Sequence, residues 1–263
     1  MDWGKIKTIF IISFLLLDIY LIYQFVNTRS EAKYEVIKEA TIDERLKNDD
    51  IVYGELPQEL GKERYISVKP KTFTEVEPVS NVQKFIDHDG TMIFGKFEEP
   101  IPVDEKFNTD DFSVIVKAIV EYGGQYRFWK KDDIEGTITY YQLYDGKMMY
   151  RNRSGKLTFY FNENNEVTSY EQTFIEEIEE MSEEQEVLTS LGAIEILYKK
   201  GMLKPRSEIT KIEFGYSTLI QLAASQVLAP TWRIVVNEEE DLFVHAFEGQ
   251  VIQFNDEETE ITE

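Results

Sequence analysis

Cysteine is absent from this chain of 263 residues, and histidine occurs only twice. Without cysteine the chain can form neither disulfide bonds nor thiolate metal sites, so any folded part must rest on its own hydrophobic core. Because His88 and His245 are the only histidines, a catalytic triad or a histidine-ligated metal site is not favoured. The G-x-S-x-G, H-E-x-x-H and P-loop patterns are also missing. The sequence therefore predicts no catalytic residue, no cofactor-binding residue and no metal ligand, and we interpret the chain as a protein that is not an enzyme.

Positive charge is scarce as well. Lysine and arginine together number 28 against 50 aspartates and glutamates, which gives a formal net charge of −22. Such a charge disfavours binding to nucleic acid and to anionic lipid headgroups. Because carboxylates are this frequent, the paired carboxylates of a wall hydrolase would not stand out from a solvated surface, so that class stays open as a minor alternative.

The two histidines lie in settings that favour structural roles. His88 stands in the turn-like stretch FIDHDGT, and His245 stands in the expected strand DLFVHAF. Asp87 and Asp89 around His88 resemble a fragment of a calcium-binding loop. An EF-hand that begins at Asp87 needs glycine at its sixth position, where this chain has Met92. We therefore reject a calcium site.

The longest apolar run covers residues 6–26 and predicts a transmembrane helix. About 20 apolar residues are needed to cross a bilayer as a helix. A cleaved signal peptide is the alternative, but no small-x-small processing site follows the run. Lys5 and Lys7 precede the run, whereas Arg29 and Lys33 after it are balanced by acids. The positive-inside rule then places the N-terminus in the cytoplasm and the remainder outside a cell membrane that the chain crosses once.

Asp18 lies near the middle of this run. A carboxylate there costs about 2.5 to 3.5 kcal/mol on insertion scales. One interpretation is that Asp18 is protonated, or is tolerated because the other residues insert the helix strongly. The other is that Asp18 faces a partner helix and meets a hydrogen-bond donor. The residues that helical spacing places on its face are Phe14, Leu15, Leu21 and Ile22.

The remainder of the chain repeats one pattern, a helix followed by strands. The first helix is expected in TDDFSVIVKAIVEYGG, capped by Thr109 or Asp110, and the second in SEEQEVLTSLGAIEILYKKG, capped by Ser182 and Gln185. Alternating runs such as KLTFYFN and DLFVHAF predict the strands, and Asp145-Gly146 predicts a tight hairpin. A single long twisted sheet competes with a division into two modules.

The fold class is therefore α+β: an N-terminal transmembrane helix followed by extracytoplasmic antiparallel sheets with packed helices, in two repeated helix-plus-sheet modules. The expected segments are a cytoplasmic N-terminus (1–5), the transmembrane helix (6–26), a stalk or first helix (27–48), a first module (49–178), a second module (179–255) and an acidic tail (256–263).

The opening MDWGKIKTIFIISFLLLDIYLIYQF and the block YYQLYDGKMMYRNRSGKLTFYFNENNEVTSYEQTF resemble the YycI family over nearly the whole chain. The resemblance implies a membrane-anchored accessory regulator of the YycG (WalK) sensor histidine kinase, paired with a YycH-like protein. It also implies control of cell-wall metabolism through transmembrane and extracytoplasmic protein contacts. The sign of that control differs within the family.

Two functions from different classes follow. The first is this non-enzymatic regulator, with the span 6–26 as part of its mechanism. The second is an extracytoplasmic sensor that recognises a cell-wall fragment or peptide in a pocket with aromatic side chains and a few polar groups.

Overall fold

The computed structural model describes residues 3–31, 40–58, 60–103, 107–181, 183–221 and 225–254. The chain divides into two compact units, Met1–Arg45 and Leu46–Glu263. The predicted tail 256–263 and the middle of the predicted stalk, residues 32–39, lie outside the described residues.

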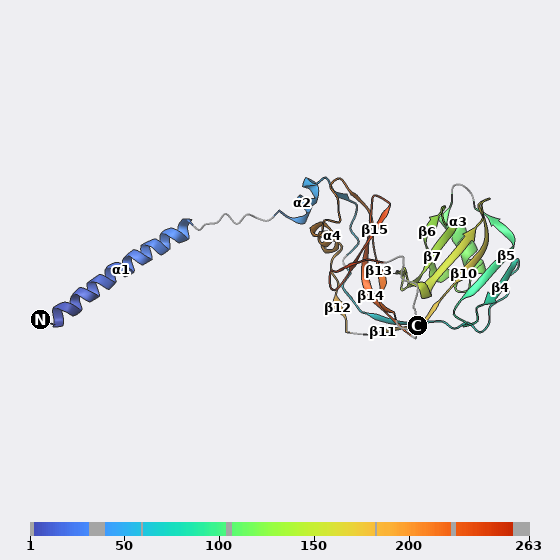
Figure 1. The fold of residues 1–263 in the computed structure, drawn as a ribbon, viewed down its shortest axis with the longest axis horizontal. Coiled ribbons are helices and arrows are strands. Elements are labelled where there is room, and N and C mark those ends of the chain that lie inside the picture. Colours follow the sequence, from blue (N-terminus) through green and yellow to red (C-terminus); the bar gives the residue numbers. More distant parts are fainter. Residues whose placement is uncertain are drawn as a thin grey trace. The chain divides into compact units, whose positions relative to one another are not determined.

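The first unit consists mainly of α1 (Trp3–Glu31), the dark-blue helix of Figure 1. Its 29 residues contain the whole predicted span and continue into the predicted stalk. Among the residues that the structure describes, no helix is long and apolar enough to cross a membrane, and the side chains of Ile6, Ile9, Phe25 and Val26 lie outside that description. The span 6–26 therefore stays a prediction.

A second helix, α2 (Ile42–Asn48), starts at a capping box. The Thr41 hydroxyl accepts a hydrogen bond from the Glu44 amide at 3.3 Å, and the Glu44 carboxylate accepts one from the Thr41 amide at 3.0 Å. This reciprocal pair satisfies two backbone donors at the helix start. The end of the predicted segment 27–48 is therefore helical.

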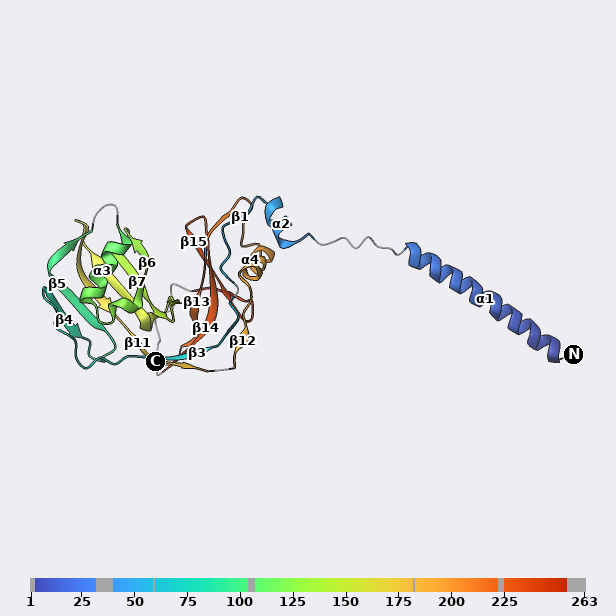
Figure 2. The same ribbon diagram turned by 180° about the vertical axis from the view of Figure 1, so that it is seen from behind.

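The larger unit is built on strands that pair in one 14-stranded network among the described residues, with α3 and α4 packed against it (Figures 1 and 2). We name its two parts by their helices. The α3 section contains α3 (Thr109–Ile119), the short 3-10 helix η1 (Gly123–Gln125) and the strands β4 (Val82–Ile86), β5 (Ile93–Pro102), β6 (Tyr126–Asp132), β7 (Thr137–Tyr144), β9 (Lys156–Phe161) and β10 (Glu166–Gln172).

The α4 section contains α4 (Ser190–Lys199) and the strands β1 (Val52–Tyr53), β3 (Ile66–Pro70), β8 (Lys147–Tyr150), β11 (Ile175–Glu180), β13 (Glu208–Gln221), β14 (Gln226–Val236), β15 (Glu240–His245) and β16 (Val251–Ile252). The 3-10 helix η2 (Arg153–Gly155) joins β8 to β9, and β2 (Lys62–Glu63) pairs separately with β12 (Gln185–Glu186). The fold is α+β, as predicted. Most pairings are antiparallel, but β13 pairs in parallel with both β1 and β8.

The β7–β8 hairpin joins the two sections. Asp145 and Gly146 at its turn have φ angles of 49° and 72°, as the predicted Asp-Gly turn requires. Gly215 of β13 faces Met148 of β8, and a Cβ atom at Gly215 would collide with the Met148 carbonyl oxygen and the Tyr150 ring. Glycine therefore permits the close approach of the two strands.

The core of the α3 section forms where α3 covers one face of its strands. Phe112 and Val116 of α3 are buried against Phe159 and Tyr140, with the rings of Phe112 and Phe159 5.0 Å apart. The helix cap differs from the prediction, because the Asn108 side chain accepts the hydrogen bonds from the Asp110 and Asp111 amides. Neither Thr109 nor Asp110 caps α3, since both are already inside it.

The second helix begins later than predicted. Gln185 belongs to β12, which pairs with Lys62 and Glu63, and Thr189 caps α4 through its hydroxyl at 3.0 Å from the Gly192 amide. Ser182 lies outside the described residues. The predicted boundary at 178/179 stays a prediction. Strand pairing places β1 and β3, from the N-terminal part of the predicted first module, beside β13 and β14.

Arg233 of β14 links the sections electrostatically. Its guanidinium lies 4.1 Å from the centroid of the Trp129 ring of β6 and donates hydrogen bonds of 2.7 Å to both Glu213 and Asp241. Burial raises the pKa of Glu213, but Lys211, Arg233 and Arg127 lower it more, so that its pKa lies below the ordinary value. The paired and stacked arginine stabilises the junction.

Candidate functional site

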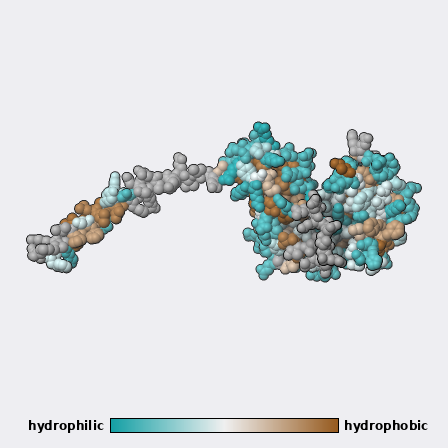
Figure 3. Space-filling model, in the orientation of Figure 1, coloured by the Kyte–Doolittle hydropathy of each residue, from teal (hydrophilic) through white to brown (hydrophobic). Residues whose placement is uncertain are grey.

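The five residues predicted for partner contact lie on one face of α1. Helical offsets of three and four residues place Phe14, Leu15, Leu21 and Ile22 beside Asp18. The exposed fractions of the four apolar side chains range from 51% for Leu21 to 63% for Ile22. Figure 3 shows hydrophobic residues covering much of the described part of α1. The face therefore combines a carboxylate with apolar side chains available for contact.

Lys7 is a residue of this face that the sequence analysis missed. A surface hollow of about 380 Å³ on α1 is lined by Lys7, Phe10, Ile11, Phe14, Leu15 and Asp18. Lys7 and Asp18 are eleven residues apart, close to three helical turns, so their side chains share one direction. The spacing was visible in the sequence, because Lys7, Ile11, Phe14 and Asp18 follow the helical repeat. The face thus carries a base near one end and an acid near its middle.

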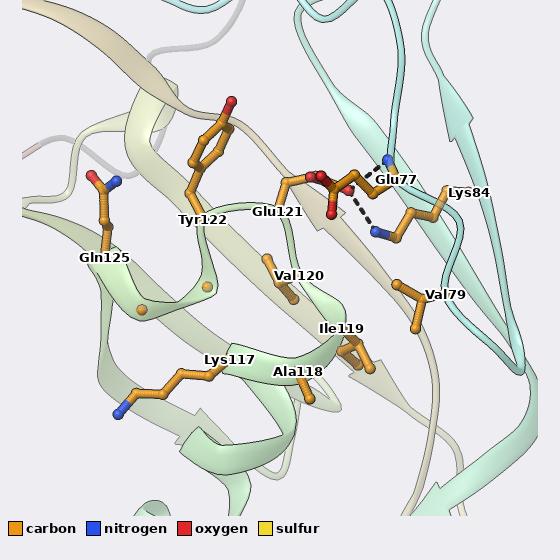
Figure 4. Close-up of a pocket in the computed structure, with 12 residues that line it drawn as sticks. Glu77, Val79, Lys84, Lys117, Ala118, Ile119, Val120, Glu121, Tyr122 and Gln125 are labelled. Carbon is orange, nitrogen blue, oxygen red and sulfur yellow. Dashed lines mark hydrogen bonds and ion pairs between the residues drawn. The ribbon is translucent and has the colours of Figure 1, made fainter.

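The larger unit has a hollow of about 420 Å³ where α3 ends (Figure 4). Glu77, Lys84 and Glu121 gather on one side of it, and Tyr122 and Gln125 stand on another. Most of the exposed lining is polar. The chain also turns sharply here, since Tyr122 has a left-handed φ of 55° before η1. This hollow could receive a polar group but offers little apolar surface.

A buried ion pair fixes the wall of this hollow. The Lys84 ammonium lies 2.6 Å from a carboxylate oxygen of Glu121, and the exposed fractions of the two side chains are 3% and 15%. The same oxygen of Glu121 accepts a hydrogen bond from the Glu77 amide at 3.1 Å. Glu121 is thus held by two donors, which rigidifies the wall.

A second hollow, of about 390 Å³, shares Tyr122 and Gln125 with the first. Its lining includes Tyr144 and Phe174, and the rings of Tyr122 and Phe174 stack 4.4 Å apart. The exposed fraction of Tyr122 is 47%. The adjoining hollows therefore meet at a half-exposed tyrosine whose ring is held in place.

The two histidines differ sharply in environment. His88 is fully exposed and lies 3.3 Å from Asp89. His245 is buried, and its Nδ1 accepts hydrogen bonds from the Phe247 and Glu248 amides at 3.2 and 3.1 Å. Burial lowers the pKa of His245, although Glu248 opposes the shift. His245 thus organises the turn after β15 as a neutral acceptor.

In the described ranges, no three His, Cys, Asp or Glu side chains lie close enough together to bind a metal ion. Asp87 instead stabilises its own turn, with hydrogen bonds from the Met92 amide at 3.0 Å and the Thr91 hydroxyl at 3.2 Å. Asp89 contacts His88 rather than Asp87.

No curated protein matches the chain. Among solved structures, an uncharacterized protein from Eubacterium rectale ATCC 33656 shares 10% identity with a TM-score of 0.45, over 79% of this chain and 92% of that one. YycH from Bacillus subtilis shares 16% identity with a TM-score of 0.40, over 73% of this chain and 54% of that one. The family model described as YycI protein matches residues 31–247, which is most of the chain. This chain therefore belongs to the YycI family.

Proposed function

We propose that this chain is a non-enzymatic, membrane-anchored regulator of a YycG (WalK)-like sensor histidine kinase that controls cell-wall metabolism. Membership of the YycI family supports the regulatory role. The observation that carries the mechanism is the face of α1, where Asp18 stands among exposed apolar side chains. Residues 6–26 form the anchor, the N-terminus is cytoplasmic and the larger unit is extracellular.

The partners follow from the same proposal. A span of the kinase or of a YycH-like protein covers the face of Asp18, Phe14, Leu15, Leu21 and Ile22, and supplies a hydrogen-bond donor to Asp18. A lone carboxylate near the middle of a span is energetically costly to insert, and a hydrogen-bond donor on a partner helix would offset part of that cost. The larger unit adds extracytoplasmic contacts.

A span exchange tests the proposal. Residues 6–26 are replaced by an unrelated transmembrane segment, and kinase output is read from a wall-metabolism reporter. We expect control by this protein to be lost, while circular dichroism shows the larger unit still folded. A matched chimera, in which only Asp18, Phe14, Leu15, Leu21 and Ile22 are restored to the foreign span, should recover control. Normal regulation by the first chimera would refute the transmembrane mechanism.

A second candidate function is an extracytoplasmic sensor of a cell-wall fragment or peptide. The two adjoining hollows favour it, since they share Tyr122 and Gln125 and place a stacked tyrosine at their common edge. Muropeptides should then raise the thermal unfolding midpoint of the full chain, and Tyr122→Ala should abolish that rise. An unchanged midpoint across a muropeptide panel would count against a sensor.

A further inference from the structure

One edge of β4 (Val82–Ile86) has no neighbouring strand among the described residues. The strand is an end of the strand order and pairs only with β5, apart from an isolated bridge between Val79 and Val82. It lies at the outer margin of the α3 section in both ribbon views (Figures 1 and 2). A free strand edge presents a row of N–H and C=O groups that can pair with another chain.

The hydrogen bonds of the β4–β5 ladder show which backbone groups point outward. The Asp87 amide, one residue after β4, donates to the Met92 carbonyl at 2.9 Å. Bonded pairs alternate along an antiparallel ladder, so the odd-numbered residues of β4 bond to β5 and the even-numbered residues point outward. Among the described residues, the backbone N–H and C=O groups of Lys84 and Ile86 have no hydrogen-bond partner within the chain.

The side chains of β4 leave this edge without a free charge. Phe85 stands directly opposite Phe94 of β5, and the two side chains are 56% and 39% exposed. Lys84 is the single charged residue of the strand, and it points to the opposite face from Phe85. Its buried ammonium lies 2.6 Å from the Glu121 carboxylate. An added strand would therefore meet exposed phenylalanine on one face and a neutralised lysine on the other.

The opposite end of the strand order is protected by charge. The six residues of β11 include four glutamates, namely Glu176, Glu177, Glu179 and Glu180. Charged side chains on an edge strand discourage pairing with another chain. Because β4 lacks this protection, its edge is the one that can accept a further strand.

Carboxylates surround the free edge. Residues 82–99 of the β4–β5 hairpin contain four acids and two lysines, and one of these lysines is Lys84, which is bound to Glu121. Asp87 follows β4 directly, and the Glu98 amide bonds to the Asn81 carbonyl just before β4. A carboxylate thus stands near each end of the strand. Basic side chains at the two ends of an added strand would complement these charges.

A second copy of this chain fits the edge poorly. Antiparallel pairing of two β4 strands about their middle residue sets Lys84 of one copy opposite Lys84 of the other, and like charges directly opposite each other destabilise a sheet. Each chain also has a formal net charge of −22, so two copies repel each other. The charges therefore favour a different protein as the occupant.

We propose that the free edge of β4 binds an extended segment of another protein as an added strand, and that this segment is apolar at alternate positions and basic at its ends. Backbone hydrogen bonds to Lys84 and Ile86 supply affinity, and contact with Phe85 and Phe94 selects apolar side chains. The inference goes beyond the proposed function, because such binding requires neither a membrane-spanning α1 nor a kinase.

A synthetic peptide tests the proposal with the full chain in detergent micelles. The probe has about nine residues, with valine and threonine alternating between two terminal lysines, and fluorescence anisotropy measures its dissociation constant. We expect binding that N-methylation of the central peptide amides abolishes, because an added strand needs these donors. Exchange of the terminal lysines for glutamates should weaken binding on the order of tenfold, because the ends then face carboxylates.

Hydrogen–deuterium exchange, resolved to single residues, locates the peptide on the unaltered chain. At saturation, exchange of the Lys84 and Ile86 amides should slow severalfold, because these amides gain acceptors. Exchange of the Phe85 amide should change little, because this amide is already bonded to β5. Unchanged exchange at both Lys84 and Ile86 would overturn the proposal.

A pair of variants isolates the outward amide. Ile86→Pro removes a donor that β5 does not use, and proline is tolerated at such positions of edge strands. Ile86→Ala is the matched control, because it shortens the same side chain but keeps the amide. We expect the peptide to bind Ile86→Pro on the order of tenfold more weakly than Ile86→Ala, with the circular dichroism spectra of both unchanged.

Three results would refute the proposal. The first is that none of the peptides binds, and the second is that the N-methylated peptide or Ile86→Pro binds as tightly as its control. The third is that sedimentation of the chain alone shows a dimer that Ile86→Pro dissociates, which would make a second copy the occupant.

Discussion

The apolar side chains of α1 and those of the larger unit are of the same types but lie in opposite environments. Phe14 and Leu15 of α1 are 59% and 56% exposed, whereas Phe159 and Tyr140 of the α3 section are fully buried. The larger unit covers its own hydrophobic residues with α3, α4 and its strands. Under the proposed function, the hydrophobic face of α1 is covered by lipid or by another protein, since each exposed apolar Å² costs about 25 cal/mol. We therefore expect the larger unit to determine folding stability and α1 to determine association.

The largest expected effect comes from opening the core of the α3 section. Phe159 contacts the rings of Phe112, Tyr140 and Tyr170, so Phe159→Ala leaves a cavity that its neighbours cannot fill. We expect the free energy of unfolding to fall by about 4 kcal/mol. Urea denaturation followed by circular dichroism measures it.

Ile134→Ala is the matched control, because Ile134 is also apolar but is 99% exposed at the β6–β7 turn. Its effect should stay within about 0.5 kcal/mol. Membrane association of the full chain should be unchanged in both variants. If Phe159→Ala released the protein from membranes, the separation of stability from association would be wrong.

The next effect concerns the ion pair at the hollow. Glu121→Ala leaves the Lys84 ammonium buried without its carboxylate, so the free energy of unfolding should fall by about 3 kcal/mol. The double variant Glu121→Leu with Lys84→Met removes both charges and should recover most of that loss. The surface pair of Lys69 and Glu177 gives the comparison, and Lys69→Ala should destabilise the protein far less, because solvent screens an exposed pair. Equal losses for Glu121→Ala and Lys69→Ala would show that burial does not determine the strength of these pairs.

A smaller effect depends on pH. Burial keeps the pKa of His245 below its ordinary value of 6.5. Between pH 6.5 and that lower pKa, His245 is therefore protonated in the unfolded chain but neutral in the folded chain. The free energy of unfolding should therefore fall as the pH drops below 6.5. His245→Gln should flatten that part of the curve, whereas His88→Gln should leave it as it is, because His88 is fully exposed. A wild-type curve that is flat below pH 6.5 would contradict the role of His245.

The parts of the fold that were predicted correctly are those determined by interactions between residues close together in the sequence. The Asp145-Gly146 turn was predicted correctly, because two successive positive φ angles require residues of this kind. The strands in KLTFYFN and DLFVHAF were also located, as β9 and β15, because buried apolar residues such as Leu157 and Phe159 recur at every second position. In both cases the determining interactions lie within a few residues.

The start of α4 and the cap of α3 were missed for different reasons. Gln185 looks like part of a capping box, but it pairs with Glu63, more than 120 residues away, and no local pattern reveals such a pairing. Asn108 was passed over in favour of Thr109, although each residue type can cap a helix. For the candidate site, spacing of three and four residues predicted the face around Asp18 but not Lys7, because Lys7 lies three helical turns from Asp18. A search of the helical repeat beyond the adjacent turns would have placed Lys7 on this face, where it lines the hollow with Asp18.

The smallest expected change in free energy affects the residue with the greatest proposed role in function. Asp18→Leu removes the carboxylate from the α1 face while keeping Phe14 and Leu15 in place, so only the hydrogen bond to a partner span is lost. Such bonds contribute roughly 1 kcal/mol within membranes, which corresponds to about a fivefold weaker association. A membrane two-hybrid assay with the kinase or the YycH-like protein measures this difference, and fractionation should show unchanged insertion. Ile12→Leu, an exposed apolar exchange at another position of α1, controls for general changes in the helix. Association at full strength in Asp18→Leu would mean that the carboxylate is merely tolerated, and that the apolar side chains alone hold the partner.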